Sequence, residues 1–420
     1  MFKIAGGAPL EGKVKVNGAK NAALPALAAC LLADEPSTLH RVTPAEDIRC
    51  MGLLLSYLGA VVRIEDRDSG ENSWTIEPAG LFRHGAPFQL VSRMRASFLI
   101  LGPLLARLGR ARIHLPGGCA IGTRPIDLHL KALAALGARI SIGDGLVSAE
   151  TNGLKGALIR LDFPSVGATE NTMMASCLAR GITTIENAAE EPEIVDLARL
   201  LITMGAKIDG AGTKRIQVEG VDRLSGTDHI LPADRIEAGT FLAAAVATRG
   251  RITVEGVDPS KLTAALLKMS EMGVEVEEGP DWIRVDARSR PRAVHLITQP
   301  YPGFPTDLQP QFTAVLSTSQ GLGRITEQVF EDRFGHAREL ERMGARIRLD
   351  GRTARIRGVS RLTGTQVSAA DLRGGAALVI AGLGAEGLTE VRGVRHIDRG
   401  YVNLEGRLAS LGACIERRWS

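Results

Sequence analysis

Cys119 lies in the segment PGGCAIGTRPIDL (116–128), between a glycine pair and an Ile-Gly step. A structural cysteine usually packs on an apolar face of a helix or strand, whereas glycines keep this backbone loose. Arg124 is close by in the sequence, and a neighbouring cation lowers the pKa of a thiol and makes it reactive. We therefore expect Cys119 to be a reactive group on a movable arm rather than a core residue.

Asp307 closes the segment YPGFPTD (301–307), in which two prolines precede the carboxylate. In the simplest interpretation, Thr306 or Asp307 accepts backbone N–H bonds at the start of a helix. Capping alone explains neither the two prolines nor the apolar surroundings of the aspartate. The pattern therefore leaves two roles open, a helix cap and a functional carboxylate.

Polar and charged residues recur at the expected starts of six helices. A helix N-terminus carries unpaired N–H groups and a partial positive charge, so it attracts anions. Lys20 is the one charge before a long apolar helix, where it opposes the helix dipole unless an anion lies beside it. We therefore expect a heavily anionic substrate. The helix starts carry Lys20 and Asn21, Arg93 and Arg95, Ser165 to Gly167, Asp234 and Arg235, Thr306 and Asp307, and Asp371 and Arg373.

These helix starts belong to a repeated unit. The phrases LGAVVRI, LGARISI, MGAKIDG, MGVEVEE, MGARIRL and LGACIER place glycines at 59, 137, 205, 273, 344 and 412, at intervals of 68 to 78 residues. Each phrase comes at the end of a helical pattern, and the helix stops at a glycine that can take the left-handed conformation. A strand, a turn and a return strand follow. This period is too long for a solenoid and fits a small α/β unit. The sequence therefore predicts six α/β units.

The last copy ends the chain at CIERRWS, without a return strand. The N-terminal IAGGAPLEGKV shares its Gly-Leu-Gly spacing with the segments that begin at Val218 and Ile356, so we expect the N-terminal strands to complete the last unit. One domain is then discontinuous, residues 1–19 plus 232–420, and the other is 20–231, with three units each. A length of 420 residues suits two domains. Two chain crossings favour a hinge with a cleft.

Composition excludes several classes of protein. The chain has 51 basic and 47 acidic residues, a net charge of +4 and only 4% aromatic residues, with no basic run of the kind that binds nucleic acid. Its five cysteines form no C-x-x-C pair, which argues against a disulfide framework or a zinc site. The N-terminus lacks the apolar stretch of a signal peptide, and the longest apolar run, 22–33, is too short to span a bilayer. We expect a cytoplasmic protein without membrane contact.

Seven segments together resemble the UDP-N-acetylglucosamine enolpyruvyl transferases, a family of bacterial enzymes. The similarity runs in register over essentially the whole chain, and the cysteine loop (about 115–125) and the FPTD segment are specific in combination. The segments are NGAKNAALP, MRAS, PGGCAIGTRPIDLH, SVGAT, PGFPTDLQPQF, DLRGGAALV and HIDRGY.

The resemblance implies a fold and a reaction. The fold would be a two-domain inside-out α/β barrel with three units per domain, which agrees with the six repeats. The reaction would transfer enolpyruvyl from phosphoenolpyruvate to the 3′-hydroxyl of UDP-N-acetylglucosamine and release phosphate, the first committed step of peptidoglycan synthesis. It would need no organic cofactor and no metal.

The resemblance also implies residue roles. Cys119, which lies in the domain 20–231, would donate a proton and assist the release of phosphate. In the discontinuous domain, Asp307 would be the general base for the 3′-hydroxyl, and Arg399 would close on the carboxylate of phosphoenolpyruvate. Lys20 would contact phosphoenolpyruvate. The remaining substrate contacts would be Asn21, Arg95, Arg124, Pro125, Asp127, Leu128, Ser165, Val166, Gly167, Thr306, Val329, Arg333, Asp371 and Arg373.

One segment departs from a common form of the family. Some members carry a lysine just before SVGA, whereas this chain reads DFPSVGA. The diphosphate is then expected to depend more on backbone amides of Val166 and Gly167 and on Arg124. Asp127 would lie near the uracil or ribose, and Val329 would touch the N-acetyl group.

Two rival functions remain open from the sequence. The sister enzyme that acts on shikimate phosphate shares the fold and the phosphoenolpyruvate contacts but, as a rule, lacks the cysteine loop. A non-catalytic sugar-nucleotide sensor would need no acid–base pair, so Cys119 and Asp307 argue against it. His129, His336 and His396 are expected to be structural, and the oligomeric state is left open.

Overall fold

The computed structural model describes residues 1–65, 72–92, 94–115 and 126–419. The chain divides into two compact units. We call the first the discontinuous unit, because it combines Met1–Asn17 with Ala233–Ser420, and the second the central unit, which lies in the chain between Gly18 and Pro232.

The central unit holds three four-stranded sheets, with strand orders β14-β3-β5-β4, β6-β7-β9-β8 and β10-β11-β13-β12. In each sheet the first pair is parallel and the other pairs are antiparallel. The strands are β3 (Ser37–Val42), β4 (Val61–Glu65), β5 (Asn72–Glu77), β6 (Gly85–Ala86), β7 (Arg110–His114), β8 (Arg139–Gly143), β9 (Leu146–Glu150), β10 (Leu158–Arg160), β11 (Ile182–Glu186), β12 (Lys207–Asp209), β13 (Arg215–Glu219) and β14 (Asp228–Ile230).

The discontinuous unit repeats this plan with the orders β16-β17-β15-β2, β18-β19-β21-β20 and β22-β23-β1-β24. The described chain therefore contains six sheets of one design, as the sequence repeat predicts. The strands are β1 (Phe2–Ala5), β2 (Glu11–Lys15), β15 (Arg251–Glu255), β16 (Glu275–Glu278), β17 (Trp282–Asp286), β18 (His295–Ile297), β19 (Leu322–Thr326), β20 (Arg346–Asp350), β21 (Thr353–Arg357), β22 (Gln366–Ser368), β23 (Leu388–Arg392) and β24 (Cys414–Arg417).

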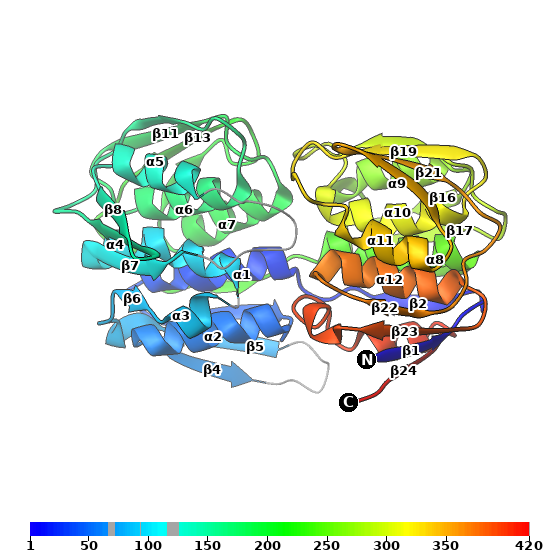
Figure 1. Cartoon of the computed structure of the whole chain (residues 1–420). Coiled ribbons are helices and arrows are strands. Elements are labelled where there is room, and N and C mark those ends of the chain that lie inside the picture. Colours follow the sequence, from blue (N-terminus) through cyan, green and yellow to red (C-terminus); the bar gives the residue numbers. More distant parts are fainter. Residues whose placement is uncertain (66–71, 93, 116–125, 420) are drawn as a thin grey trace. The chain divides into compact units, whose positions relative to one another are not determined.

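The N-terminal strands join two different sheets. β1 lies between β23 and β24, with Phe2 opposite Val391 and Arg417, so it supplies the strand that the last repeat lacks (Figure 1). β2 instead pairs in parallel with β15 in another sheet. The expectation that both strands complete the last unit is therefore right for β1 and wrong for β2.

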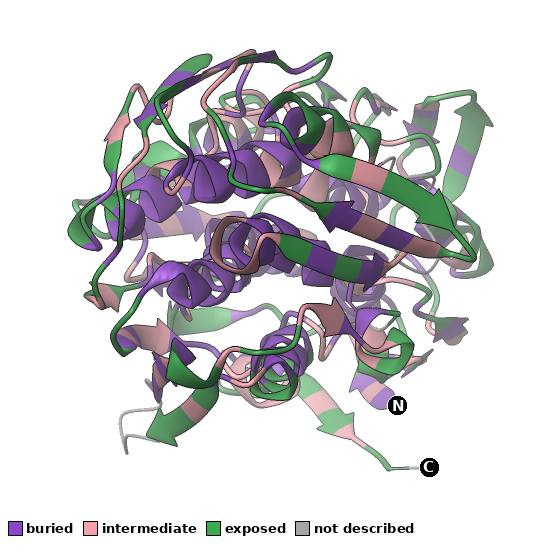
Figure 2. Ribbon diagram, turned by 90° about the vertical axis from the view of Figure 1, so that its left-hand side faces the viewer, coloured by how far each residue is buried: buried purple, intermediate pink, exposed green. Residues whose placement is uncertain are grey.

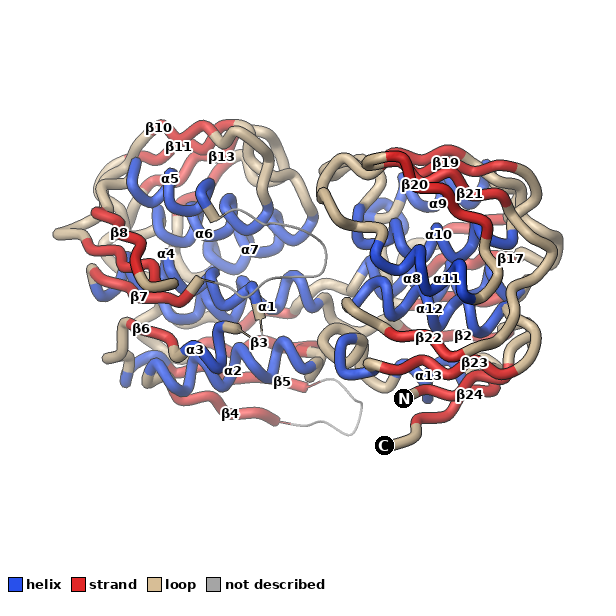
Figure 3. Tube along the Cα trace, viewed as in Figure 1, coloured by secondary structure: helices blue, strands red, loops and turns tan. Residues whose placement is uncertain are grey.

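In each unit the sheets surround a set of inner helices, with further helices near the surface (Figure 3). The inner helices are α1 (Lys20–Ala29), α4 (Leu101–Leu108), α6 (Val166–Ser176), α8 (Arg235–Thr248), α10 (Gln309–Thr318) and α12 (Leu372–Gly384). The others are α2 (Glu46–Leu58), α3 (Phe88–Val91), α5 (Asp127–Ala135), α7 (Pro192–Thr203), α9 (Thr263–Glu271), α11 (Gly335–Arg342) and α13 (Leu404–Ala409). Short 3₁₀ turns cover Cys30–Leu32, Pro78–Gly80, Arg95–Ile100, Pro259–Lys261, Thr306–Leu308 and Val394–His396.

The inner helices lack an exposed polar face, because neighbouring elements cover most of their residues. All residues of α8 but one are buried, and Figure 2 shows buried helices enclosed by strands whose outward residues are exposed. Small residues allow the close approach: a Cβ on Gly239 would lie 2.6 Å from Cδ1 of Leu308. α11 is amphipathic by contrast and buries only His336, Ala337 and Leu340.

The repeated glycines end the surface helices. All six glycines of the repeat have φ between 82° and 112°, which the sequence analysis predicts and which a residue with a Cβ adopts only under strain. Each glycine turns the chain from a helix into an edge strand of the following sheet.

Within the described residues, no helix is long and apolar enough to cross a membrane.

Candidate active site

The carboxylate of Asp307 lies between two guanidinium groups of the discontinuous unit. Nη2 of Arg333 donates to Oδ1 at 2.8 Å, while Nε and Nη2 of Arg373 lie 3.3 and 3.2 Å from Oδ2. The side chains of Arg333 and Arg373 are 2% and 4% exposed, whereas that of Asp307 is 26% exposed. Both cations favour the charged form of the carboxylate and leave it partly open to solvent.

Asp307 is the second residue of the turn Thr306–Leu308, which leads directly into α10. The turn Thr306–Leu308 and the following α10 both begin without a side-chain capping bond. The carboxylate of Asp307 pairs with Arg333 and Arg373, contacts that favour a functional role, while its role as a cap stays a prediction.

A chain of hydrogen bonds fixes the orientation of Arg373. Its Nη1 donates to the hydroxyl of Tyr401 at 3.0 Å, and this hydroxyl lies 2.8 Å from Oγ1 of Thr240. Because Thr240 donates its own proton to the carbonyl of Ile236, it accepts from Tyr401. Burial raises the pKa of Tyr401, so the phenol stays neutral and can serve as this donor. Sequence reasoning missed Tyr401 and Thr240, although HIDRGY contains the tyrosine.

Glu327 organises the segment that precedes Arg333. The buried carboxylate accepts the backbone N–H groups of Val329 and Phe330 at 2.8 and 3.1 Å, and the hydroxyl of Thr306 at 2.9 Å. It thus ties the predicted contact Val329 to the residue before Asp307. Sequence reasoning missed this role of Glu327, and a carboxylate directly after a strand was the available signal.

Two predicted contact residues cap helices. Asp371 accepts the N–H groups of Arg373 and Gly374 at 3.0 and 2.9 Å, and Ser165 accepts that of Ala168 at 3.4 Å. Asp234 caps α8 in the same way. A cap can still face a ligand, so the binding roles of Asp371 and Ser165 stay predictions.

In the central unit, Lys20 is the first residue of α1 and is almost completely buried. Its Nζ lies 2.9 Å from Oδ2 of Asp47, a buried residue in the first turn of α2. The expectation that a ligand anion accounts for this lysine was therefore incomplete, because Asp47 supplies a protein anion. Asp47 was not among the predicted residues.

Other predicted contacts of the central unit also lie at helix starts. Asn21 is in the first turn of α1, Arg95 opens a 3₁₀ turn, Asp127 and Leu128 open α5, and Val166 and Gly167 open α6. Gly167 lies close to His129, because a Cβ there would be 3.1 Å from Cε1 of the imidazole. Burial lowers the pKa of His129 to about 4, and Asn171 bonds its Nδ1 at 3.1 Å, which fits the expected structural role.

Several predicted residues lie outside the described chain. Cys119, Arg124, Pro125 and Arg93 belong to this group. Their roles stay predictions. Among the described residues, no group of three or more His, Cys, Asp or Glu side chains is placed to hold a metal ion.

A cavity of about 270 Å³ adjoins the segment before Asp307. Its lining includes Arg235, Lys261, Tyr301 and Pro305, and the guanidinium of Arg235 lies 5.7 Å from the ring centroid of Tyr301. The discontinuous unit thus provides a hollow lined by Tyr301 to Gly303 and Pro305, residues of the segment that leads to Asp307.

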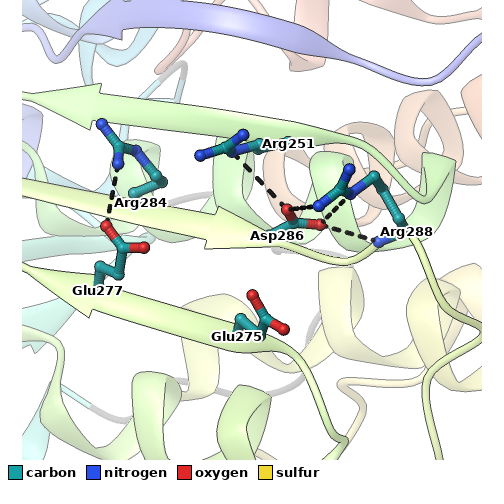
Figure 4. Close-up of a pocket in the computed structure, with 6 residues that line it drawn as sticks. All are labelled: Arg251, Glu275, Glu277, Arg284, Asp286 and Arg288. Atoms are coloured by element: carbon teal, nitrogen blue, oxygen red, sulfur yellow. Dashed lines mark hydrogen bonds and ion pairs between the residues drawn. The ribbon is translucent and has the colours of Figure 1, made fainter.

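A second cavity, about 110 Å³, carries only charged side chains of one sheet (Figure 4). Arg288 pairs with Asp286 at 2.7 Å, and Arg284 pairs with Glu277 at 2.9 Å. These strands bear none of the predicted site residues. The arginines of both pairs reach solvent, and ion pairs with a solvated partner contribute little to stability, so we interpret this cluster as a charged sheet surface.

Comparisons with known proteins agree on one family. The family profile of EPSP synthase (3-phosphoshikimate 1-carboxyvinyltransferase) matches residues 4–408. UDP-N-acetylglucosamine 1-carboxyvinyltransferase 2 of Carboxydothermus hydrogenoformans is 54% identical over 99% of both chains. UDP-N-acetylglucosamine 1-carboxyvinyltransferase 1 of Caldanaerobacter subterraneus subsp. tengcongensis is 50% identical, again over 99% of both chains.

Solved structures show the same fold. The enolpyruvyl transferase NikO from Streptomyces tendae has a TM-score of 0.88 at 26% identity and covers 99% of this chain and 98% of its own. EPSP synthase from Acinetobacter baumannii has a TM-score of 0.75 at 19% identity over 99% of both chains, a likeness of fold alone. The predicted two-domain inside-out α/β fold is confirmed by these neighbours.

Proposed function

Because the chain belongs to the EPSP synthase family of enolpyruvyl transferases, we propose that it transfers enolpyruvyl from phosphoenolpyruvate to the 3′-hydroxyl of UDP-N-acetylglucosamine. The main support for this acceptor is sequence identity: two UDP-N-acetylglucosamine 1-carboxyvinyltransferases are 54% and 50% identical to this chain over nearly its whole length. The likeness to EPSP synthase structures is far lower in identity, which favours the sugar nucleotide over shikimate phosphate. The enzyme then serves the first committed step of peptidoglycan synthesis.

The proposed reaction is an addition followed by an elimination. Phosphoenolpyruvate gains a proton at C3 while the sugar oxygen bonds to C2 and gives up its own proton. This gives a tetrahedral intermediate. Loss of a proton from C3 and of phosphate from C2 then forms the enol ether. Both substrates carry several negative charges, so a basic site is required to bind them.

Asp307 fits the role of the base that removes the 3′-hydroxyl proton. Arg333 and Arg373 favour its ionised form, which is the form that can accept a proton. The contacts of Arg373 with Tyr401 hold the pair in one orientation, so the carboxylate needs little reorganisation before reaction. Its partial exposure is consistent with access by a substrate hydroxyl.

The other proposed roles follow the sequence predictions. Lys20, held by Asp47, would place its ammonium group against phosphoenolpyruvate, and Arg399 would bind the carboxylate of the same substrate. Cys119 would supply the proton to C3 and assist the departure of phosphate.

We also propose a cytoplasmic location. The four described cysteines are free thiols, as expected in a reducing compartment.

Acceptor-dependent phosphate release tests the proposed function. The purified protein is incubated with phosphoenolpyruvate and either UDP-N-acetylglucosamine or shikimate 3-phosphate. We expect phosphate release only with the sugar nucleotide. Release with shikimate 3-phosphate alone would support the rival enzyme, and binding of the sugar nucleotide without release would support a sensor.

A further inference from the structure

A short turn carries Arg399 between two anchored residues. It begins at Val394, whose carbonyl accepts the N–H groups of Ile397 and Asp398 at 2.8 and 3.0 Å, and the carbonyl of Ile397 accepts that of Tyr401 at 3.0 Å. Ile397 and Tyr401 are buried. The side chain of Tyr401 contacts Arg373, which fixes the C-terminal side of the turn to the partner of Asp307.

Arg417 fixes the other side of the turn. Its Nη1 and Nη2 donate to the two oxygens of Asp398 at 3.0 and 2.6 Å, a bidentate pair. The same guanidinium bonds both oxygens of Glu405 in α13. One side chain at the end of β24 therefore holds both the residue before Arg399 and the helix that follows the turn.

The surroundings of Arg417 favour a rigid guanidinium. Its Cζ lies 4.9 Å from the ring centroid of Phe2 and 5.4 Å from that of Trp419, and its side chain is 17% exposed. Asp398 and then Glu405 raise the pKa of Arg417, so it stays charged. A planar fork that stacks on rings and pairs two carboxylates permits little movement.

We propose that Arg417 is a positioning residue for Arg399 in the enolpyruvyl transfer. The inference rests on the proposed function, in which Arg399 binds the carboxylate of phosphoenolpyruvate. By holding Asp398 on one side, while Tyr401 holds the other, Arg417 fixes the backbone from which Arg399 projects.

Charge gives a second reason for the pairing. Asp398 is adjacent to Arg399 in the chain, so a carboxylate released from Arg417 would offset the positive charge that Arg399 offers to an anion. Pairing with Arg417 neutralises Asp398, so this carboxylate does not offset the positive charge of Arg399. Loss of the pair is therefore expected to weaken phosphoenolpyruvate binding more than sugar-nucleotide binding.

The test combines Arg417→Gln with Arg399→Ala. We expect Arg417→Gln to raise KM for phosphoenolpyruvate at least about tenfold and to change Kd for UDP-N-acetylglucosamine less than about twofold. Arg417→Lys keeps the charge but not the fork and should be intermediate, and it also serves if the glutamine variant does not fold. The matched control is Arg418→Gln, which removes a neighbouring exposed arginine that pairs with Glu416 and should behave as wild type.

Non-additivity separates positioning from a merely structural role. If Arg417 acts through Arg399, adding Arg417→Gln to Arg399→Ala should lower kcat/KM for phosphoenolpyruvate no further. A full additional loss in the double variant, or an unchanged KM in Arg417→Gln, would overturn the inference while leaving the proposed function intact. Wild-type protein without acceptor-dependent phosphate release would instead overturn the proposed function.

Discussion

The almost fully buried guanidinium of Arg333 lies 2.8 Å from the carboxylate of Asp307, which is itself about one quarter exposed. Buried charges are retained where they are paired, so this arginine depends on the aspartate for compensation. The aspartate, in turn, keeps a face toward solvent. This asymmetry suits a carboxylate that must meet a substrate hydroxyl.

Asp307→Asn should therefore impair turnover more than binding. The amide keeps the shape and can still accept a hydrogen bond from an arginine, but it cannot take the 3′-hydroxyl proton. We expect a folded protein that binds UDP-N-acetylglucosamine and turns over at least about a hundredfold more slowly. Asp350→Asn, at an exposed carboxylate of β20, is the control. Wild-type turnover in Asp307→Asn would contradict the assignment of the base.

The buried pair of Lys20 and Asp47 predicts a stability effect. Asp47→Asn removes the charge that compensates the ammonium of Lys20, and a charge-assisted bond of this kind contributes about 2 kcal/mol. We expect the free energy of unfolding to fall by that amount and KM for phosphoenolpyruvate to rise. Asp34→Asn breaks an exposed pair with Arg107 and should cost less than about 1 kcal/mol. Equal losses of unfolding free energy in the two variants, measured by denaturant unfolding, would show that the buried pair of Lys20 and Asp47 stabilises the fold no more than the exposed pair does.

His336 predicts a pH dependence of stability. Burial lowers its pKa to about 4, whereas an unfolded histidine titrates near 6.5, so below that pH the unfolded chain binds the extra proton. This contribution to stability is fully present above about pH 6.5 and is lost as the pH falls toward 4, by roughly 3 kcal/mol. Nε2 of His336 has no hydrogen-bond partner in the described part of the chain, so His336→Phe should be tolerated. An unchanged slope of unfolding free energy against pH in His336→Phe would exclude this histidine as the cause.

Cys119 should be the thiol that reacts with a small anionic epoxide resembling phosphoenolpyruvate, and much faster with UDP-N-acetylglucosamine present. Burial raises the pKa of Cys30 and of Cys177 to about 12, so neither is expected to react. Cys414 is exposed and provides an internal control whose labelling should not depend on the nucleotide. Mass spectrometry of a digest reads out each site. Labelling of Cys119 at one rate with and without the nucleotide would contradict the predicted dependence of its reactivity on the sugar nucleotide.

Local patterns explain what the sequence could predict. The six glycines at the ends of surface helices reflect a backbone conformation that glycine adopts most easily, so the repeat could be counted from residue types alone. The polar residues at inner helix starts were also visible, because the unpaired N–H groups at a helix N-terminus favour polar side chains and anions. Their chemistry was less certain, because Asp371 as a cap and Asp371 as a ligand contact have the same sequence pattern.

Non-local pairings explain what it could not. Lys20 meets Asp47 from another helix, and Asp307 meets Arg373 across 66 residues of chain. No spacing rule connects such partners, since they depend on how the repeats stack. The pairing of β2 with β15, rather than with the last sheet, depends on the same stacking.

The central claim is that UDP-N-acetylglucosamine accepts enolpyruvyl by addition and elimination. The most direct measurement is the mass and NMR spectrum of the product formed in deuterated water from phosphoenolpyruvate and UDP-N-acetylglucosamine. Protonation at C3 followed by loss of a proton should place deuterium on the vinyl CH₂ of an enolpyruvyl sugar nucleotide. A product without label would contradict the mechanism, and the absence of any enolpyruvyl sugar nucleotide would contradict the function.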